Sequence, residues 1–282
     1  MSSPSRPVTE LDKSDVLSGL FGTWDSLDRL LSGLSKQQWQ TPTPLPGWCV
    51  HDVVAHIIGT ESVLQGLSAP DADVDVDVSA LGHVRNDVGI ANERWVRHLS
   101  TESGAELQER FRSITVDRRK RLTDMSVDDW NAPTLTPVGP ESYGRFMRVR
   151  LFDCWMHEQD IRDGLGRPSS DAELSGPAGQ LALDEIAATM GYVVGKLGQA
   201  PDGSRVAIEL TGPLTRTIRV DVDGRAQVVD DFGGSDPTST IRLDGLLFTR
   251  LAGGRTDDAT GVEFSGDTEV GARIVERWNF VI

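Results

Sequence analysis

The sequence predicts an α+β protein made of an N-terminal four-helix bundle followed by a smaller α+β domain. The 282 residues are enough for two ordinary domains. Up to about residue 165, apolar residues recur at helical spacing with little strand signal. After Pro168, short β-rich runs mix with helical stretches, which is typical of α+β domains. We therefore expect a boundary near residues 166–175, with residues 1–168 and 169–282 as the two domains.

The first predicted helix covers residues 11–34 and is followed by a connection. Its apolar face is formed by residues three to five positions apart: Leu11, Val16, Leu20, Trp24, Leu27, Leu31 and Leu34. The segment TPTPLPG, residues 41–47, interrupts the helical pattern with prolines and glycine. A second amphipathic helix then extends to Leu64. We expect a solvated loop at residues 67–83, because DADVDVDV combines four aspartates with only small and β-branched residues. Its spacing is not that of an EF-hand loop, so we expect no calcium there.

Further helices are expected at residues 84–99, 104–123 and 143–164. Between the last two, NAPTLTPVGP at residues 131–140 breaks the chain. The final helix of this half runs into Gly-Leu-Gly-Arg-Pro, a strong C-terminal stop signal. Together these segments predict an antiparallel bundle of four main helices.

The second half begins with a predicted helix at residues 181–197. The runs VAIEL, TIRVDV and AQVVDD follow, separated by Gly-Pro and Asp-Gly. Then come the strand STIRLD, a helix at residues 246–252, the strand VEFSG and a last helix at residues 270–278. This order predicts a compact α+β domain.

The composition excludes several kinds of partner. A formal net charge of -15 would repel nucleic acid and anionic membranes, so we expect neither as a partner. The basic run at residues 118–121 is short and lacks interleaved aromatic residues, so we interpret it as a solvated helix face. The chain starts without an apolar signal-peptide core, and Cys49 and Cys154 are too few for a disulfide framework. We expect a cytoplasmic protein.

Two histidines and an aspartate form a candidate metal site. Asp153 and His157 are one helical turn apart, so both side chains can reach a single point. His56 lies among apolar residues of the second helix and faces the bundle, whereas we expect His51, in the charged first turn, to face water. A hydrogen-bonded core histidine and a helix-stabilising Asp–His pair are the alternatives. Divalent metals, zinc above all, prefer such a ligand set.

Two motifs resemble the mycothiol-dependent maleylpyruvate isomerase family of DinB-like metal-binding four-helix bundles. They are WQTPTPLPGWCVHDVVAHI and DCWMHEQDIRDGLGRP, in that order. The resemblance implies a divalent metal, usually zinc, held by His56, Asp153 and His157. The family's glutamate is Asp153 here, one methylene shorter. A usual serine or threonine is replaced by Cys49, a poorer helix N-cap, although Asp52 still favours the helix N-terminus.

The resemblance extends to the second half through STIRLDGLLFTRLAGGR and ERWNFVI. It implies a sterol-carrier-like α+β domain that covers the metal cleft. Arg250 and Arg255 then become candidate catalytic-site residues that bind a substrate or cofactor carboxylate through forked hydrogen bonds. Surface arginines are the alternative.

Three protein ligands would leave an open coordination position, as in catalytic zinc sites. By resemblance, mycothiol occupies it as a thiolate and attacks a small electrophile, either to isomerise it or to transfer the thiol. Asp160 continues the Asp153–His157 face and either orients an imidazole, contacts substrate, or pairs with Arg162. We expect Trp48 and Trp155 to pack the bundle.

Two other functions remain open on the sequence alone. One is a hydrolase in which metal-bound water is the nucleophile. The other is a non-catalytic protein that binds a small hydrophobic ligand in its C-terminal domain.

Overall fold

The computed structural model describes residues 8–68, 77–136 and 139–281, and its chain divides into two compact units. The first unit contains residues 1–168 and the second contains residues 169–281. Most of the acidic stretch DADVDVDV, for which we expected a solvated loop without calcium, lies outside the described residues. Within the described ranges, no helix combines the length and the apolar character needed to cross a membrane.

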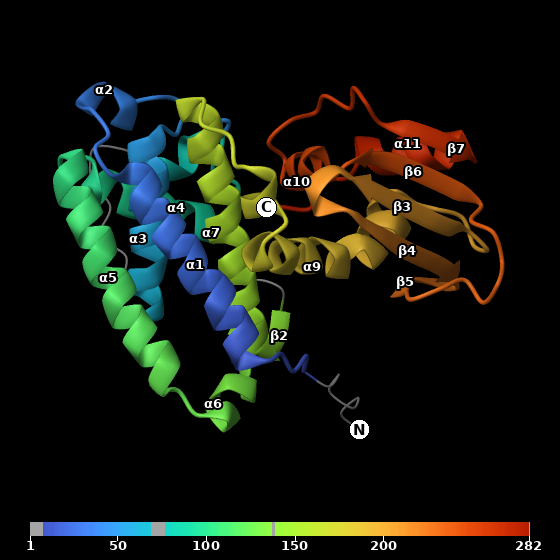
Figure 1. Ribbon diagram of the computed structural model, residues 1–282, viewed down its shortest axis with the longest axis horizontal. Helices are drawn as coiled ribbons and strands as arrows, with labels where there is room; N and C mark the ends of the chain where they lie inside the picture. The colour runs from blue at the N-terminus through green and yellow to red at the C-terminus, as the bar shows by residue number, and fades with distance from the viewer. Residues whose placement is uncertain (1–7, 69–76, 137–138, 282) are drawn as a thin grey trace. The chain divides into compact units, whose positions relative to one another are not determined.

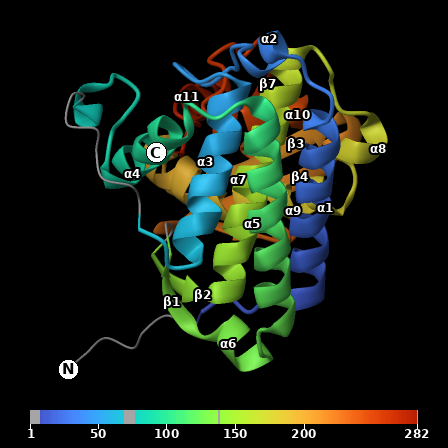
Figure 2. The same ribbon diagram turned by 90° about the vertical axis from the view of Figure 1, so that its left-hand side faces the viewer.

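The first unit is built on four long helices, as predicted. They are α1 (Lys13–Leu31), α3 (Val50–Leu64), α5 (Gly104–Asp124) and α7 (Tyr143–Leu165). Figure 2 shows these helices side by side, with α7 in contact with both α1 and α3. Their buried apolar side chains form the core of the unit, which includes Leu20, Trp24, Val54 and Leu151. Burial of these helix faces is what holds the helices together.

Shorter elements connect and flank the four helices. They are α2 (Lys36–Trp39), η1 (Val78–Ala80), α4 (Asp87–Leu99), α6 (Val127–Asn131), β1 (Pro133–Thr136) and β2 (Gly139–Ser142). The helix α4 packs on α3 and corresponds to the segment predicted at residues 84–99. The break predicted before the last helix is more ordered than expected, because β1 and β2 pair as an antiparallel hairpin.

Helix α7, which carries most of the candidate site, has well-defined ends. The Ser142 side chain accepts a hydrogen bond from the backbone N–H of Arg145, which caps the N-terminus. The helix ends at Gly166, whose φ of 63° lies in the left-handed region that glycine tolerates best. The glycine-rich stop signal in the sequence therefore ends the helix as predicted.

The second unit has a five-stranded sheet in the order β5-β4-β3-β6-β7 (Figure 1). The strands are β3 (Arg205–Thr211), β4 (Arg216–Asp223), β5 (Arg225–Val229), β6 (Ser239–Asp244) and β7 (Glu263–Gly266). Strands β3 and β6 are parallel and the other neighbours are antiparallel. All five strands agree with the runs expected from the sequence.

Helices cover the apolar face of this sheet. The helical segments are α8 (Asp171–Leu174), α9 (Pro177–Tyr192), η2 (Val193–Leu197), η3 (Gly212–Leu214), α10 (Gly245–Ala252) and α11 (Thr268–Glu276). Ile208, Ile218 and Ile241 lie side by side in the register and are buried, whereas Glu209 and Arg242 form an ion pair beside them. This alternation of apolar and polar residues gives an α+β unit with one packed sheet face.

Candidate metal centre

His56 reaches the centre of the bundle from the middle of α3. The N-terminus of α3 is stabilised by Asp52, whose carboxylate accepts the backbone N–H of Cys49 at 2.9 Å. Six residues into the helix, the His56 side chain is only 7% exposed and turns its Nε2 toward α7. Its Nδ1 has no hydrogen-bond partner in the described part of the chain. Nε2 is therefore the ring nitrogen that His56 presents to α7 at the centre of the bundle.

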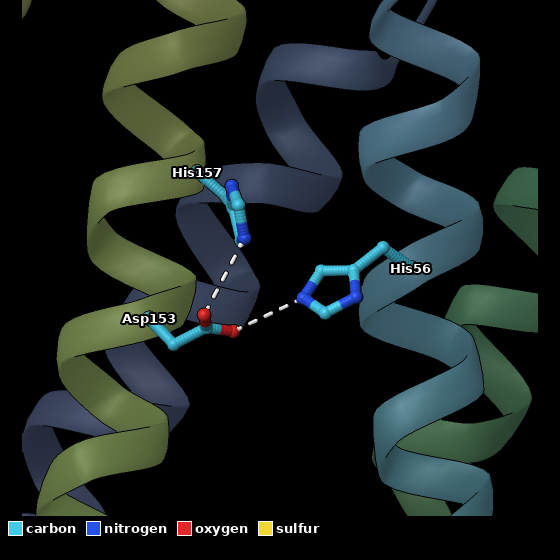
Figure 3. Close-up of side chains that lie close together, drawn as sticks. All are labelled: His56, Asp153 and His157. Atoms are coloured by element: carbon cyan, nitrogen blue, oxygen red, sulfur yellow. Dashed lines mark ion pairs between the residues drawn. The ribbon is translucent and has the colours of Figure 1, made fainter. Parts of the chain in front are cut away.

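Asp153 and His157 lie one turn apart on α7 and meet His56 (Figure 3). His56 Nε2 is 3.4 Å from Asp153 Oδ2, and His157 Nε2 is 3.4 Å from Asp153 Oδ1. The ligand atoms of all three residues lie within 4.8 Å of one another. Thus the structure brings together the three residues that the sequence selected.

These distances fit a single small cation. Nitrogen and oxygen ligands bind zinc at about 2.0–2.2 Å, so two ligands on a tetrahedral ion are about 3.4 Å apart. The two histidine–carboxylate distances have this value, each to a different oxygen of Asp153, and the ligand atoms of the three residues lie within 4.8 Å of one another. The donor set of two imidazoles and one carboxylate is also one that zinc and related divalent metals accept. Asp153 has 31% of its side chain exposed, whereas His56 is 7% exposed.

Asp160 holds the second nitrogen of His157. Its Oδ2 lies 3.0 Å from His157 Nδ1, and Asp160 itself is buried. A carboxylate at Nδ1 keeps the proton on that nitrogen and leaves Nε2 with a lone pair for a metal. Arg162, the other partner considered for Asp160, forms an ion pair with Glu158.

The charges around the centre keep Asp153 ionised. Burial alone would raise its pKa, but the positive charges of His157 and Arg150 and hydrogen bonds from both histidines outweigh burial. The pKa of Asp153 therefore lies well below its usual range. Burial lowers the pKa of His56 despite Asp153, whereas Asp153 and Asp160 outweigh burial at His157 and raise its pKa.

Trp48 lies against the centre, which the sequence did not predict. Its ring centroid is 5.2 Å from that of His56 and 6.4 Å from that of His157. The indole N–H donates to Glu93 on α4 at 2.8 Å, and Glu93 also contacts His83. The indole of Trp48 therefore lines the site as well as packing against its neighbours. Trp155 is buried in the bundle, as expected.

The expectation that residues 118–121 form a solvated face is wrong for Arg118. This side chain is fully buried, and its Nε donates to Glu61 at 2.8 Å. Glu61 lies on α3 and also pairs with Arg150 on α7, which in turn contacts Asp153. Sequence reasoning missed this chain of ion pairs because Glu61 is far in sequence from both arginines that it contacts.

The expectation that His51 faces water is also wrong. His51 is 4% exposed, and its Nε2 lies 2.9 Å from the carbonyl oxygen of Glu102. Its ring packs edge-on against Trp39 of α2. These neighbouring segments cover the first turn of α3. His51 is therefore buried although it does not belong to the metal centre.

Arg250 and Arg255 lie close together in the second unit. Arg250 is in the last turn of α10, and its carbonyl oxygen accepts the backbone N–H of Arg255. Arg255 Nη1 donates to the carbonyl oxygen of Gly253 at 2.6 Å. Both side chains are half-buried. Their predicted roles in carboxylate binding stay predictions.

Two family models match the chain. The model of the mycothiol maleylpyruvate isomerase N-terminal domain matches residues 20–162, and that of the isomerase C-terminal domain matches residues 180–273. The first match includes His56, Asp153 and His157 together with Asp160. The second includes Arg250 and Arg255.

Solved structures and curated proteins give further likenesses. The crystal structure of the mycothiol-dependent maleylpyruvate isomerase has a TM-score of 0.59 at 18% identity, covering 90% of this chain and 93% of that one. A histidine-to-alanine mutant of it has a TM-score of 0.58 at 17% identity with the same coverage. At these identities, the likeness shows the fold.

Two uncharacterised proteins of Mycobacterium tuberculosis, from strains CDC 1551 and H37Rv, are each 28% identical over 162 residues. These matches cover 56% of this chain, which spans 60% of the length of either relative. Because the two family models together match most of the chain, it belongs to the mycothiol maleylpyruvate isomerase family.

Proposed function

We propose that this protein is a divalent-metal-dependent enzyme that uses mycothiol to isomerise a small electrophile or to transfer the thiol to it. The observation that carries the proposal is the convergence of His56, Asp153 and His157 on one point inside a bundle of this family. Zinc is the metal we propose, because the ligand set and the distances suit it. By their names, the related isomerases act on maleylpyruvate, so maleylpyruvate is the first substrate to test.

The chain's own residues prepare the site for thiol chemistry. A divalent metal held there would lower the pKa of a bound thiol, so that the thiol is deprotonated near neutral pH. His56 and His157 would bind the metal through Nε2, and Asp153 would add a negative charge through its carboxylate. Asp160 keeps the Nδ1 proton on His157, and the ring of Trp48 lies against both histidine rings.

Arg250 and Arg255 supply the second part of the proposal. A guanidinium group can bind the carboxylate of a keto acid or of the thiol cosubstrate through paired hydrogen bonds. This role requires the second unit to cover the metal cleft, which we propose as part of the enzyme's architecture. The family match favours such a thiol-dependent enzyme over a hydrolase or a ligand-binding protein.

The proposal is tested first by metal content and then by turnover. Protein purified without chelator is analysed by plasma mass spectrometry as wild type, His56→Ala and His157→Ala. We expect about one zinc per chain in wild type and loss of zinc in both variants, because two ligands cannot hold the ion firmly. The exposed His98 gives a control, and His98→Ala should keep the metal.

The zinc-loaded wild type is then assayed with maleylpyruvate, with and without mycothiol. Turnover that needs mycothiol and is lost in His56→Ala supports the proposal. Turnover without any thiol would indicate the hydrolase instead. A wild-type protein that takes up no divalent metal contradicts the proposed enzyme.

A further inference from the structure

We propose that Arg150 is a positioning residue that orients Asp153 for metal binding and is itself fixed by Glu61. The inference rests on the proposed metal site and adds a residue to it. Arg150 lies three residues before Asp153 on α7, so the two side chains lie on the same side of that helix. Its Nη1 donates to Asp153 Oδ2, the oxygen that also faces His56.

Arg150 has little freedom to move. Its side chain is 5% exposed, and both Nε and Nη2 donate to Glu61 Oε1, at 3.1 Å and 2.9 Å. Nη2 also contacts Cys154 Sγ at 3.5 Å. The planar guanidinium thus bridges two carboxylates, one on α3 and one on α7, which a lysine cannot do with the same geometry.

Glu61 in turn is held from both sides. Its side chain is 1% exposed, and each oxygen accepts a different arginine: Arg150 at Oε1 and Arg118 at Oε2. Two arginines, Glu61 and Asp153 together make an electrically balanced group, which lets it remain buried. Of the two arginines, Arg150 forms the ion pair with Asp153, a candidate metal ligand.

The contact matters because Asp153 is a short ligand. An aspartate must be aimed by its surroundings, and partners of ligating carboxylates commonly decide how they bind. Holding Oδ2 at Arg150 restricts rotation of the carboxylate and fixes the direction in which it faces the two histidines. The remaining coordination positions then stay open for thiol and substrate.

The test is a titration of the 282-residue chain with cobalt(II), in which visible absorption is used to monitor binding. Cobalt replaces zinc in such sites, and its absorption reports the number and geometry of ligands. The variants are Arg150→Gln, which removes the contact and the charge, and Arg150→Lys, which keeps the charge and loses the bridge. Arg118→Gln is the matched control, because it removes a buried arginine from Glu61 without touching Asp153.

We expect both Arg150 variants to bind cobalt about 10- to 100-fold more weakly than wild type, with a changed visible spectrum. Arg118→Gln should lower the unfolding temperature but keep the wild-type affinity and spectrum. Wild-type affinity and spectrum in both Arg150 variants would overturn the inference, as would an equal loss in Arg118→Gln. If Arg150→Gln does not fold, Arg150→Lys alone decides between these results.

The same titration separates this inference from the proposed function. If wild type binds cobalt but the Arg150 variants bind it equally well, only the positioning role fails. If wild type binds neither cobalt nor zinc, the metal site itself fails and the positioning role falls with it.

Discussion

His157 is held through both ring nitrogens, which distinguishes it from His56. Its Nε2 faces Asp153 and its Nδ1 contacts Asp160, whereas His56 Nδ1 has no hydrogen-bond partner in the described part of the chain. A histidine fixed in this way has one tautomer and one orientation available. His157 is therefore the better organised of the two candidate imidazole ligands.

Asp160→Asn tests whether the contact with Asp160 makes His157 a better metal ligand. The amide keeps the size of the side chain but removes the charge that stabilises the Nδ1 proton, so zinc affinity should fall about tenfold. The measurement is competition with a chromophoric chelator. Asp163→Asn, an exposed position on the same helix, is the control. Equal affinity in wild type and Asp160→Asn would show that Asp160 does not tune the ligand.

The two cysteines should differ in reactivity. Burial, reinforced by the negative charges of Glu61 and Asp153, outweighs Arg150 and raises the pKa of Cys154 to about 12. Cys49 is half-buried, and burial and Asp52 raise its pKa as well. At pH 8, a disulfide reagent should modify Cys49 slowly and Cys154 only after unfolding. Cys49→Ser should then show no thiol that reacts before unfolding; rapid labelling of Cys154 would contradict the buried position.

At the scale of elements, the site depends on how α3 is packed between its neighbours. Gly59 follows His56 by three residues and lies against the ring of Trp95 on α4. A Cβ atom added at Gly59 would lie 2.5 Å from the Trp95 side chain, closer than carbon atoms can approach. Glycine therefore lets α4 approach α3 beside the candidate ligand.

Gly59→Ala should lower the free energy of unfolding by about 1–3 kcal/mol, because the added methyl group overpacks this contact. Gly22→Ala is the matched control: Gly22 is inside α1 with nothing near its missing Cβ atom. There the change should stabilise the protein by about 0.5–1 kcal/mol through helix propensity. Chemical denaturation measures the free energy of unfolding of both variants and of wild type. A Gly59→Ala protein as stable as Gly22→Ala would show that α4 can move away without cost.

At the scale of the whole molecule, the proposed enzyme needs functions from both units. The first unit contains the candidate metal ligands, and the second contains Arg250 and Arg255. Loss of a metal ligand and loss of a substrate-binding arginine should therefore have separable effects. The former removes the metal, whereas the latter affects binding and turnover with the metal still present.

Arg250→Ala and Arg255→Ala should each lower kcat/KM for a carboxylate substrate about 10- to 100-fold, the effect of losing a hydrogen bond to a charged group. Their zinc content should equal that of wild type. Arg242→Ala removes an exposed arginine paired with Glu209 in the same unit and should leave kcat/KM unchanged. Unchanged kinetics in both Arg250→Ala and Arg255→Ala would remove these arginines from the proposed site.

The sequence by itself determined the longer helices, the five strands of the second unit and the three candidate ligands. Helical spacing is local, so the position of Asp153 one turn before His157 places both on one face whatever surrounds the helix. The same periodicity placed His56 on the inner face of its helix, and turn residues marked where helices end. The resemblance in two motifs added the family, which both family models support.

Only the tertiary structure decided which side chains from different helices meet. Glu61 and Arg150 are 89 positions apart, and nothing local in the sequence records their contact. The burial of His51 and Arg118 and the approach of Trp48 to both histidines likewise depend on how α2, α3, α5 and α7 are packed. Periodicity fixes the direction of a side chain from its own helix, but its neighbours depend on the crossing of helices that fold together from distant parts of the chain.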